Sequence, residues 1–134
     1  MKTFFADTFY YLALLNPSDR AHGGAVAITG GLEGSIITTE WVLTELADGI
    51  AQTPDRRQFK AFLDALRADP DVRIVAFDRA LFDAGVELYD SREDKDWSLT
   101  DCISFVVMQR EHIVEALTGD KHFEQAGYVA LLRS

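Results

Sequence analysis

The sequence predicts an α/β fold, with a mostly parallel central sheet that helices cover on both faces. Short apolar segments of strand character alternate along the 134 residues with longer segments of helical character. Strands separated by helices are joined by crossovers that leave them parallel. Apolar and aromatic residues make up 48% of the chain, enough for one hydrophobic core. We therefore expect a single domain over residues 1–134.

The first half of the chain contains two of the expected strands. The first apolar segment has strand composition and stops at Asp7, after which the run TFYYLALL is compatible with a helix. An Asn-Pro-Ser-Asp turn ends this helix and supplies caps for the next one, which glycines close. The expected elements are strand 3–6, helix 8–15, helix 19–31, strand 35–38 and helix 40–50.

The second half continues the alternation and contains three more expected strands. Its most charged stretch, residues 91–96, is too short to separate domains and leads directly into an apolar helix. The expected elements are helix 56–68, strand 72–76, helix 79–91, helix 98–111, strand 115–118, a short helix and a strand near 128–132.

Charge and hydropathy disfavour several classes of protein. With 13 Lys and Arg against 22 Asp and Glu, the net charge is −9, which argues against a simple DNA-binding module. No apolar stretch approaches the roughly 20 residues that cross a bilayer, and the N-terminus lacks signal-peptide features. We therefore expect a soluble, cytoplasmic protein. The single cysteine, Cys102, lies in an apolar helix and is expected in the core.

Four acidic residues stand at or near boundaries between the expected elements. Asp7 and Asp120 each follow a strand, while Glu45 and Asp101 lie in helices. The carboxyl ends of parallel strands meet at one edge of a sheet, so acids distant in the sequence can converge there. Each acid also has an ordinary explanation: Asp7 and Asp120 as helix caps, and Glu45 as a solvated residue. Asp101 could form a capping box with Ser98, three residues earlier.

Together the four acids predict a site for a hard divalent cation. Mg²⁺ prefers oxygen ligands and is held by a few carboxylates together with water and substrate phosphates. Without a cation, carboxylates gathered in one pocket would repel one another, and some would take up protons. In a phosphodiester hydrolase such an ion activates water and stabilises the leaving oxygen. A site of this kind can therefore serve a nuclease.

Other enzyme classes lack their motifs in this chain. It contains no GxxxxGK[ST] loop, dinucleotide-binding glycine pattern, GxSxG elbow or HExxH helix. An Asp-x-Asp phosphatase is disfavoured because Phe9 stands where its second acid would be. A phosphorelay receiver domain is a closer alternative, since it is also a small acidic α/β domain with a late lysine, here Lys121. It is disfavoured because Asp7 is single and Asp78, after the middle strand, has no paired acid.

Four blocks are distributed in order over nearly the whole length of the chain, and those around Asp101 and Asp120 are the most specific. They are FADT from Phe5, TTEWVLTEL from Thr38, WSLTDCISF from Trp97 and ALTGDKHF from Ala116. Together they resemble the PIN-domain ribonucleases, especially the VapC-type toxins.

The resemblance implies a compact three-layer α/β/α sandwich and a Mg²⁺- or Mn²⁺-dependent endoribonuclease. It also implies a cognate antitoxin partner and, commonly, a homodimer. Thr8 matches the hydroxyl residue that often follows the first acid, and Asp96 is a candidate auxiliary acid. The residues that the resemblance assigns to the catalytic metal site are Asp7, Glu45, Asp101 and Asp120.

Our hypothesis for the reaction is that Asp7 and Asp101 hold the main ion. Glu45 and Asp120 would bind it through water or help to hold a second ion. Metal-activated water would attack the phosphorus in line and leave a 5′ phosphate and a 3′ hydroxyl, without using the RNA 2′-OH as nucleophile. Two alternatives stay open: a housekeeping PIN-type RNA-processing nuclease, and a catalytically silent α/β module that acts by binding a partner.

Two further groups of residues are candidates for partner contacts, and His22 and His112 are assigned no role because they lack metal-ligand spacing. The basic residues that could meet phosphates, although solvated surface charge explains each equally well, are Arg92, Lys95, Lys121 and His122. The apolar residues that could receive an antitoxin helix if exposed, with core or dimer contact as the ordinary explanation, are Tyr10, Tyr11, Leu14, Phe59 and Phe62.

Overall fold

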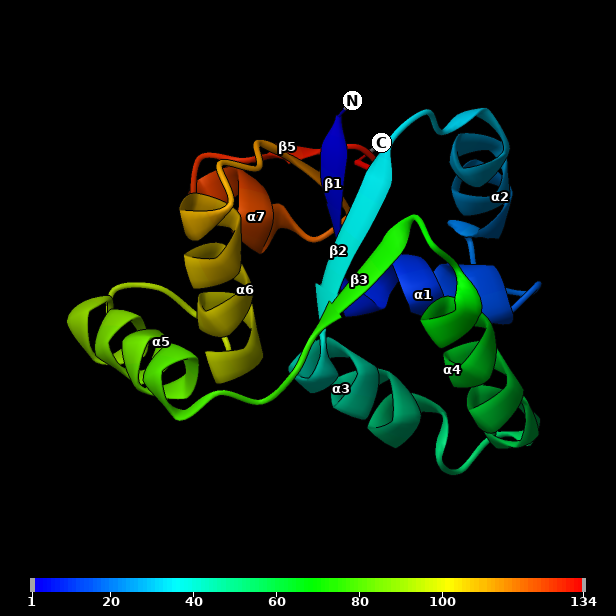
Figure 1. Cartoon of the computed structure of the whole chain (residues 1–134), viewed down its shortest axis with the longest axis horizontal. Coiled ribbons are helices and arrows are strands. Elements are labelled where there is room, and N and C mark those ends of the chain that lie inside the picture. The colour runs from blue at the N-terminus through cyan, green and yellow to red at the C-terminus, as the bar shows by residue number, and fades with distance from the viewer. Residues whose placement is uncertain (1, 134) are drawn as a thin grey trace.

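The computed structural model describes residues 2–133, so Met1 and Ser134 of the expected domain 1–134 lie outside the described residues. The described part has five strands, seven α-helices and a short 3₁₀ helix, η1, at Pro54–Gln58 (Figure 1). The strands are β1 (Thr3–Ala6), β2 (Ser35–Thr39), β3 (Val72–Val75), β4 (Glu115–Leu117) and β5 (Val129–Ala130). The helices are α1 (Thr8–Leu15), α2 (His22–Gly31), α3 (Glu40–Ile50), α4 (Phe59–Ala68), α5 (Arg79–Ser91), α6 (Leu99–Arg110) and α7 (Lys121–Gln125). None of these helices is long and apolar enough to cross a membrane.

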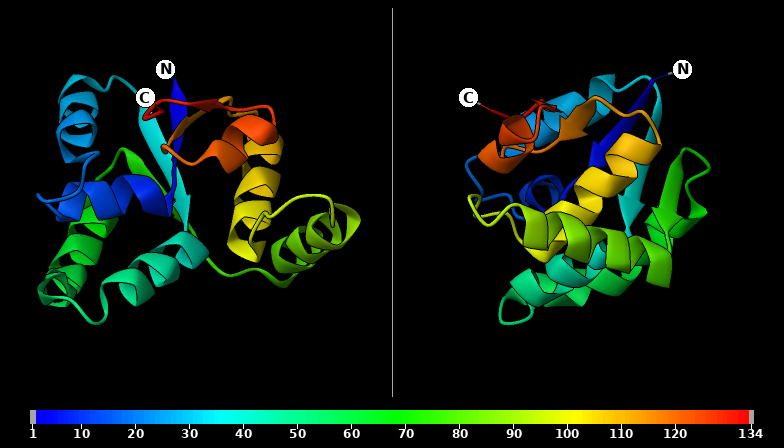
Figure 2. Two further views of the ribbon diagram at one scale, coloured as in Figure 1. Left: turned by 180° about the vertical axis from the view of Figure 1, so that it is seen from behind. Right: turned by 90° about the vertical axis from the view of Figure 1, so that its left-hand side faces the viewer.

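The strands form one sheet in the order β3-β2-β1-β4-β5, and every neighbouring pair is parallel. The central strand pairs on both sides: Phe5 lies opposite Ile37 of β2 and opposite Ala116 of β4. Helices α1, α2 and α4 lie on one side of the strands, and α5, α6 and α7 lie on the other (Figures 1 and 2). The expected α/β/α sandwich is therefore confirmed, and its sheet is parallel throughout.

The hydrophobic core forms around β1 because helices cover this central strand on both faces. Phe5 and Ala6 are completely buried, and burying a side chain the size of Phe5 contributes roughly 1.5–3 kcal/mol. Cys102 and Ile103 of α6 are also completely buried, which confirms the expected core position of the cysteine. Gly85 lets α5 approach α6 closely, because a Cβ atom there would lie 2.4 Å from the Cγ1 atom of Ile103.

Tyr10 and Tyr11 belong to the core and not to a docking surface. Both side chains are 1% exposed, and the Tyr11 ring packs edge-on against Phe62 of α4. The two tyrosines are therefore not available to an antitoxin helix in this conformation, and the core explanation is the right one for them. Leu14, Phe59 and Phe62 are partly buried against the same core.

Two helix starts differ from the sequence-based expectation. α2 begins at His22 and not at residue 19, because the Asp19 carboxylate accepts a hydrogen bond from the backbone N–H of Ala21 and holds a turn instead. The helix expected at 56–68 begins earlier and is divided, since Pro54 starts the 3₁₀ helix η1 before α4 follows. The last strand is shorter than expected, at two residues. None of these differences changes the order of the strands.

Candidate active site

Asp7 lies at the carboxyl end of the central strand, and only 4% of the residue is exposed. It occupies the N-cap position of α1, but its side chain makes no capping hydrogen bond. Its Oδ2 atom instead accepts a hydrogen bond of 2.9 Å from the Thr118 hydroxyl. The capping explanation for Asp7 is therefore wrong. A buried carboxylate is costly without a charge partner, so this position favours a bound cation.

Glu45 is oriented by the start of α3. Thr39 caps this helix, its hydroxyl accepting a hydrogen bond of 3.1 Å from the Val42 N–H. One turn further on, the half-buried Glu45 accepts a hydrogen bond from the Thr8 hydroxyl of α1. Glu45 is thus held against the residue next to Asp7, and the solvated-residue explanation does not hold. Thr8 lies beside the acids, as its place in the sequence suggested.

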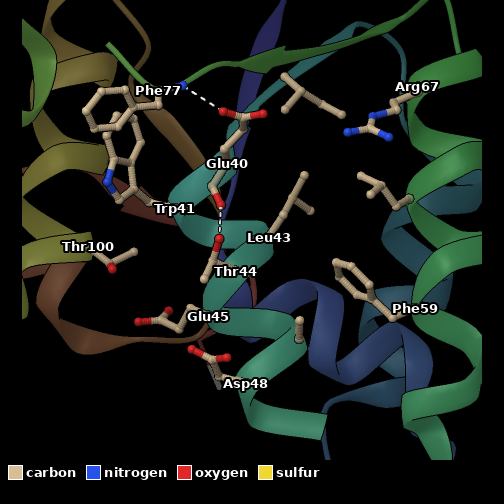
Figure 3. Close-up of a pocket in the computed structure, with 13 residues that line it drawn as sticks. Glu40, Trp41, Leu43, Thr44, Glu45, Asp48, Phe59, Arg67, Phe77 and Thr100 are labelled. Carbon is tan, nitrogen blue, oxygen red and sulfur yellow. Dashed lines mark hydrogen bonds between the residues drawn. The ribbon is translucent and has the colours of Figure 1, made fainter. Parts of the chain in front are cut away.

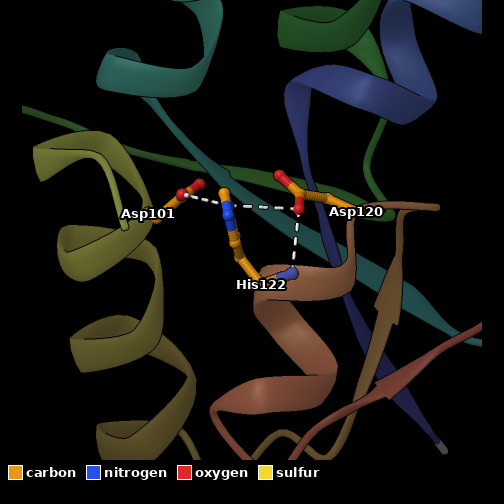
Figure 4. A group of neighbouring side chains, drawn as sticks. All are labelled: Asp101, Asp120 and His122. Atoms are coloured by element: carbon orange, nitrogen blue, oxygen red, sulfur yellow. Dashed lines mark hydrogen bonds and ion pairs between the residues drawn. The ribbon is translucent and has the colours of Figure 1, made fainter. Parts of the chain in front are cut away.

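Asp101 and Asp120 face each other across the side chain of His122 (Figure 4). The Nδ1 atom of His122 lies 3.2 Å from Asp101 Oδ2 and 3.2 Å from Asp120 Oδ1. One ligand atom from each of the three residues lies within 4.8 Å of the other two. This spacing suits a shared cation. Sequence reasoning named His122 only as a phosphate contact, and its position two residues after Asp120 was the available signal for a closer role.

The capping explanations for Asp101 and Asp120 are correct, but they do not compete with a metal site. Ser98 and Asp101 form a reciprocal capping box at the start of α6, with hydrogen bonds of 3.0 and 3.1 Å. Asp120 caps α7 by accepting a hydrogen bond of 2.8 Å from the His122 N–H. Each cap fixes its carboxylate at a helix N-terminus, and the two helix N-termini meet. Capping therefore orients these two acids toward one another.

The four acids lie close enough to perturb one another. Burial raises the pKa of Asp7 from 3.8 to about 7, against the hydrogen bond from Thr118, and the charges of Asp101 and Glu45 raise it further. Burial is also the main cause of the raised pKa of Glu45, to which Asp101 and Asp120 add. The pKa of Asp101 is raised by burial and by Asp120. A divalent cation among these carboxylates would relieve their repulsion, so the donor set fits Mg²⁺ or Mn²⁺.

Thr118 joins two of the acids, and sequence reasoning gave it no role. Its hydroxyl donates to Asp7 and accepts a hydrogen bond of 3.0 Å from the Asp120 backbone N–H. The residue is completely buried just after β4. The Thr118 hydroxyl therefore fixes both the Asp7 side chain and the backbone of Asp120. Its signal in the sequence was a hydroxyl residue two positions before Asp120.

Asp96 and Arg92 lie apart from this arrangement. Asp96 is exposed, and among residues 2–133 no hydrogen bond or ion pair links it to the four acids. Arg92 forms an ion pair with Asp94 at 2.9 Å, and its guanidinium lies 4.9 Å from the ring centroid of Trp97. The role of Asp96 stays a prediction. The Arg92 side chain is held by Asp94 and Trp97 in this structure.

Comparison with known proteins places the chain in a family. The family model of the PIN domain matches residues 4–128. The 23S rRNA-specific endonuclease VapC20 of Mycobacterium tuberculosis is 28% identical over 125 residues, which are 93% of this chain and 95% of that protein. The crystal structure of the same protein, described as a Sarcin-Ricin loop cleaving toxin, superimposes with a TM-score of 0.86 at 27% identity and covers 94% of this chain and 96% of VapC20.

Two more distant structures share the fold. VapBC2 from Rickettsia felis, bound to a DNA fragment from its promoter, has a TM-score of 0.65 at 15% identity and covers 96% of each chain. FitAcB from Neisseria gonorrhoeae has a TM-score of 0.64 at 18% identity, covering 95% of this chain and 94% of its own. Since the family model spans all four acidic positions, the chain belongs to the PIN domain family.

Proposed function

We propose that this chain is a divalent-metal-dependent endoribonuclease and the toxin of a VapBC-type toxin-antitoxin pair. The observation that carries the proposal is the convergence of four acids, from the end of β1, from α3 and from the starts of α6 and α7, at the carboxyl ends of the strands. They are Asp7, Glu45, Asp101 and Asp120. The similarity to VapC20, described as a 23S rRNA-specific endonuclease, favours ribosomal RNA as the substrate. A cognate antitoxin and a homodimer are part of the same proposal.

In this proposal Asp7 and Asp101 bind the main Mg²⁺ or Mn²⁺ ion, and Glu45 and Asp120 bind its water or a second ion. When bound, the ion supplies a Lewis acid that activates water and balances the negative charge of the phosphate. The Thr118 and Thr8 hydroxyls hold the Asp7 and Glu45 carboxylates in place. The residues that we propose for the metal site are Asp7, Glu45, Asp101 and Asp120. Thr8 and Asp96 are proposed as auxiliary residues beside them.

Cleavage of RNA by the purified protein tests the activity. In Mg²⁺ or Mn²⁺ the wild type should produce fragments with 5′ phosphate and 3′ hydroxyl ends, and EDTA should stop the reaction. Asp101→Asn should slow cleavage by at least about 100-fold, because loss of outer-sphere partners already costs 10- to 100-fold at metal sites. The Asn side chain can still accept the capping hydrogen bond from Ser98, so the helix is preserved.

Asp83→Asn is the matched control, because Asp83 is an exposed acid on α5 and the charge change is the same. Its cleavage rate should equal that of the wild type. Cleavage that continued unchanged in Asp101→Asn would refute the assigned site. Intact RNA with the wild type in every metal would instead favour the catalytically silent module. A co-purifying antitoxin that stops cleavage would separate a toxin from a housekeeping nuclease.

A further inference from the structure

A cleft of about 620 Å³ runs across α3, between α4 on one side and the segment that follows β3 on the other (Figure 3). Its volume is in the range of pockets that hold small organic groups. Trp41 and Phe77 form one wall, while Phe59 and Arg67 of α4 form the opposite one. The cleft is thus a defined feature beside the acids, and apart from Glu45 the chemistry described above does not use the residues that line it.

The cleft is continuous with the candidate active site. Glu45 lines the cleft and also accepts the hydrogen bond from Thr8 that holds it beside Asp7. Thr100, which precedes Asp101 in the first turn of α6, lines the same end. Whatever occupies the cleft therefore lies next to the bond that the acids would cut.

The wall formed by Trp41 and Phe77 is aromatic and fixed in place. The Phe77 side chain is 56% exposed, so its ring is accessible from the cleft. Its ring centroid lies 5.6 Å from that of Trp41 and 6.3 Å from that of Phe82. The Glu40 carboxylate accepts a hydrogen bond of 2.7 Å from the Phe77 N–H, which holds the backbone of this segment. The Arg79 guanidinium carbon lies 5.8 Å from the centroid of the Phe77 ring, and an exposed aromatic ring beside a guanidinium is a surface on which an unpaired base can stack.

The charges of the cleft select a base over a phosphate. Glu40, Glu45 and Asp48 line it with a single cationic residue, Arg67. Carboxylates repel a phosphate group but accept hydrogen bonds from the N–H groups on the edge of a base. Arg67 forms no ion pair within residues 2–133, so its guanidinium is free to meet a flanking phosphate.

We propose that this cleft holds one unpaired base of the RNA substrate, stacked on Phe77 and Trp41 beside the bond that is cleaved. The inference rests on the proposed endoribonuclease function and adds to it the place where one base of the substrate lies. In a duplex the base would remain stacked within the helix and could not enter the cleft.

Binding of a labelled hairpin RNA with a single-stranded loop tests this inference, with Ca²⁺ in place of Mg²⁺ and gel electrophoresis to verify that the RNA stays intact. Phe77→Ala should weaken binding about tenfold in fluorescence anisotropy, within the range that loss of one stacked base produces. Tyr89→Ala should leave binding unchanged, because Tyr89 is an equally exposed aromatic residue, 53%, on α5 outside the cleft. A blunt duplex of the same stem should bind weakly to all three proteins.

Tryptophan fluorescence locates the base. The loop RNA should quench the wild-type emission, and Trp41→Phe should retain binding but lose the quenching, since the other tryptophan, Trp97, is buried elsewhere. Unchanged loop binding in Phe77→Ala, as expected if a helix of a partner protein occupies the cleft instead, would overturn the inference. So would quenching that persists in Trp41→Phe.

Cleavage of the same hairpin in Mn²⁺ separates this inference from the proposed function. Cleavage by the wild type together with unaltered RNA binding by Phe77→Ala would refute the base site alone. Phe77-dependent binding with no cleavage in Mg²⁺ or Mn²⁺ would support the base site and refute the nuclease.

Discussion

Asp7 is a carboxylate in the position of a core residue, between the central strand and α1. Its hydrogen bond from Thr118 lowers the pKa, but burial outweighs that effect and raises the pKa to about 7. In the metal-free protein the neutral form of Asp7 is therefore favoured on folding. A cation reverses this preference, because it stabilises the ionised form that binds it.

The raised pKa of Asp7 predicts how the stability of the protein changes with pH. The pKa of Asp7 is higher in the folded state, about 7, than the ordinary value of 3.8. The unfolding free energy of the metal-free protein should therefore fall as the pH rises from 4 through 7, by roughly 4 kcal/mol from this carboxyl. Glu45 and Asp101, whose pKa values are also raised, act in the same direction.

Urea unfolding in EDTA at pH 5 and pH 8 measures this effect. Asp7→Asn cannot ionise, so its stability should change less between the two pH values than that of the wild type. Asp83→Asn, at an exposed position, should follow the wild type. If the unfolding free energies of the wild type and Asp7→Asn change equally with pH, ionisation of the Asp7 carboxyl does not destabilise the folded protein.

Among the secondary-structure elements, the site depends on the contacts between the carboxyl ends of β1 and β4. These strands are adjacent and parallel, with Ala6 opposite Leu117. The Thr118 hydroxyl lies one residue beyond this pair and contacts Asp7 and the Asp120 backbone. The Thr118 side chain therefore fixes the Asp7 carboxylate relative to the backbone of Asp120.

Thr118→Val should weaken metal binding by 10- to 100-fold, the usual cost of losing a group that orients a metal ligand. Valine is nearly the same size but neither donates to Asp7 nor accepts from Asp120. Thr118→Ser keeps the hydroxyl and should restore most of the affinity. Isothermal titration with Mn²⁺ measures both variants, and equal affinities for Val and Ser would show that the hydroxyl has no orienting role.

The sequence predicted the elements well where local chemistry decides them. The strand at 3–6 and the helix at 8–15 match β1 and α1, since a short apolar run and a helix-compatible run meet at Asp7. The start of α2 was wrong because Asp19 can cap a helix or hold a turn, and the choice depends on the path of the chain before His22. Local patterns do not contain that information.

Prediction of the site had a similar limit. The four acids could be named because each stands at or near an element boundary and because the surrounding blocks resemble a known family. Thr118 and His122 could not be assigned their contacts, because these arise from the pairing of β1 with β4 and from the meeting of α6 with α7. The sequence thus predicted the charged groups, while the groups that orient them required the fold.

At the scale of the whole molecule, a net charge of −9 opposes the approach of RNA. The acidic edge of the sheet would add to this repulsion in the absence of a cation. Metal binding would make the same edge able to receive a phosphate, and the neighbouring aromatic cleft would add stacking contacts to a base. RNA binding in this account therefore depends on the ion.

The melting temperature in Mg²⁺ or Mn²⁺ shows whether the fold gathers the four acids into one site for a divalent cation. A ligand of the folded state at about 100 times its dissociation constant stabilises a protein by about 2.7 kcal/mol, which corresponds to a rise of several degrees for a chain of this size. The wild type and Asp83→Asn should show this rise at millimolar metal, and Asp101→Asn should lose it. The four acids do not form such a site if the melting temperature of the wild type responds to neither metal, or if Asp101→Asn shows an equal rise.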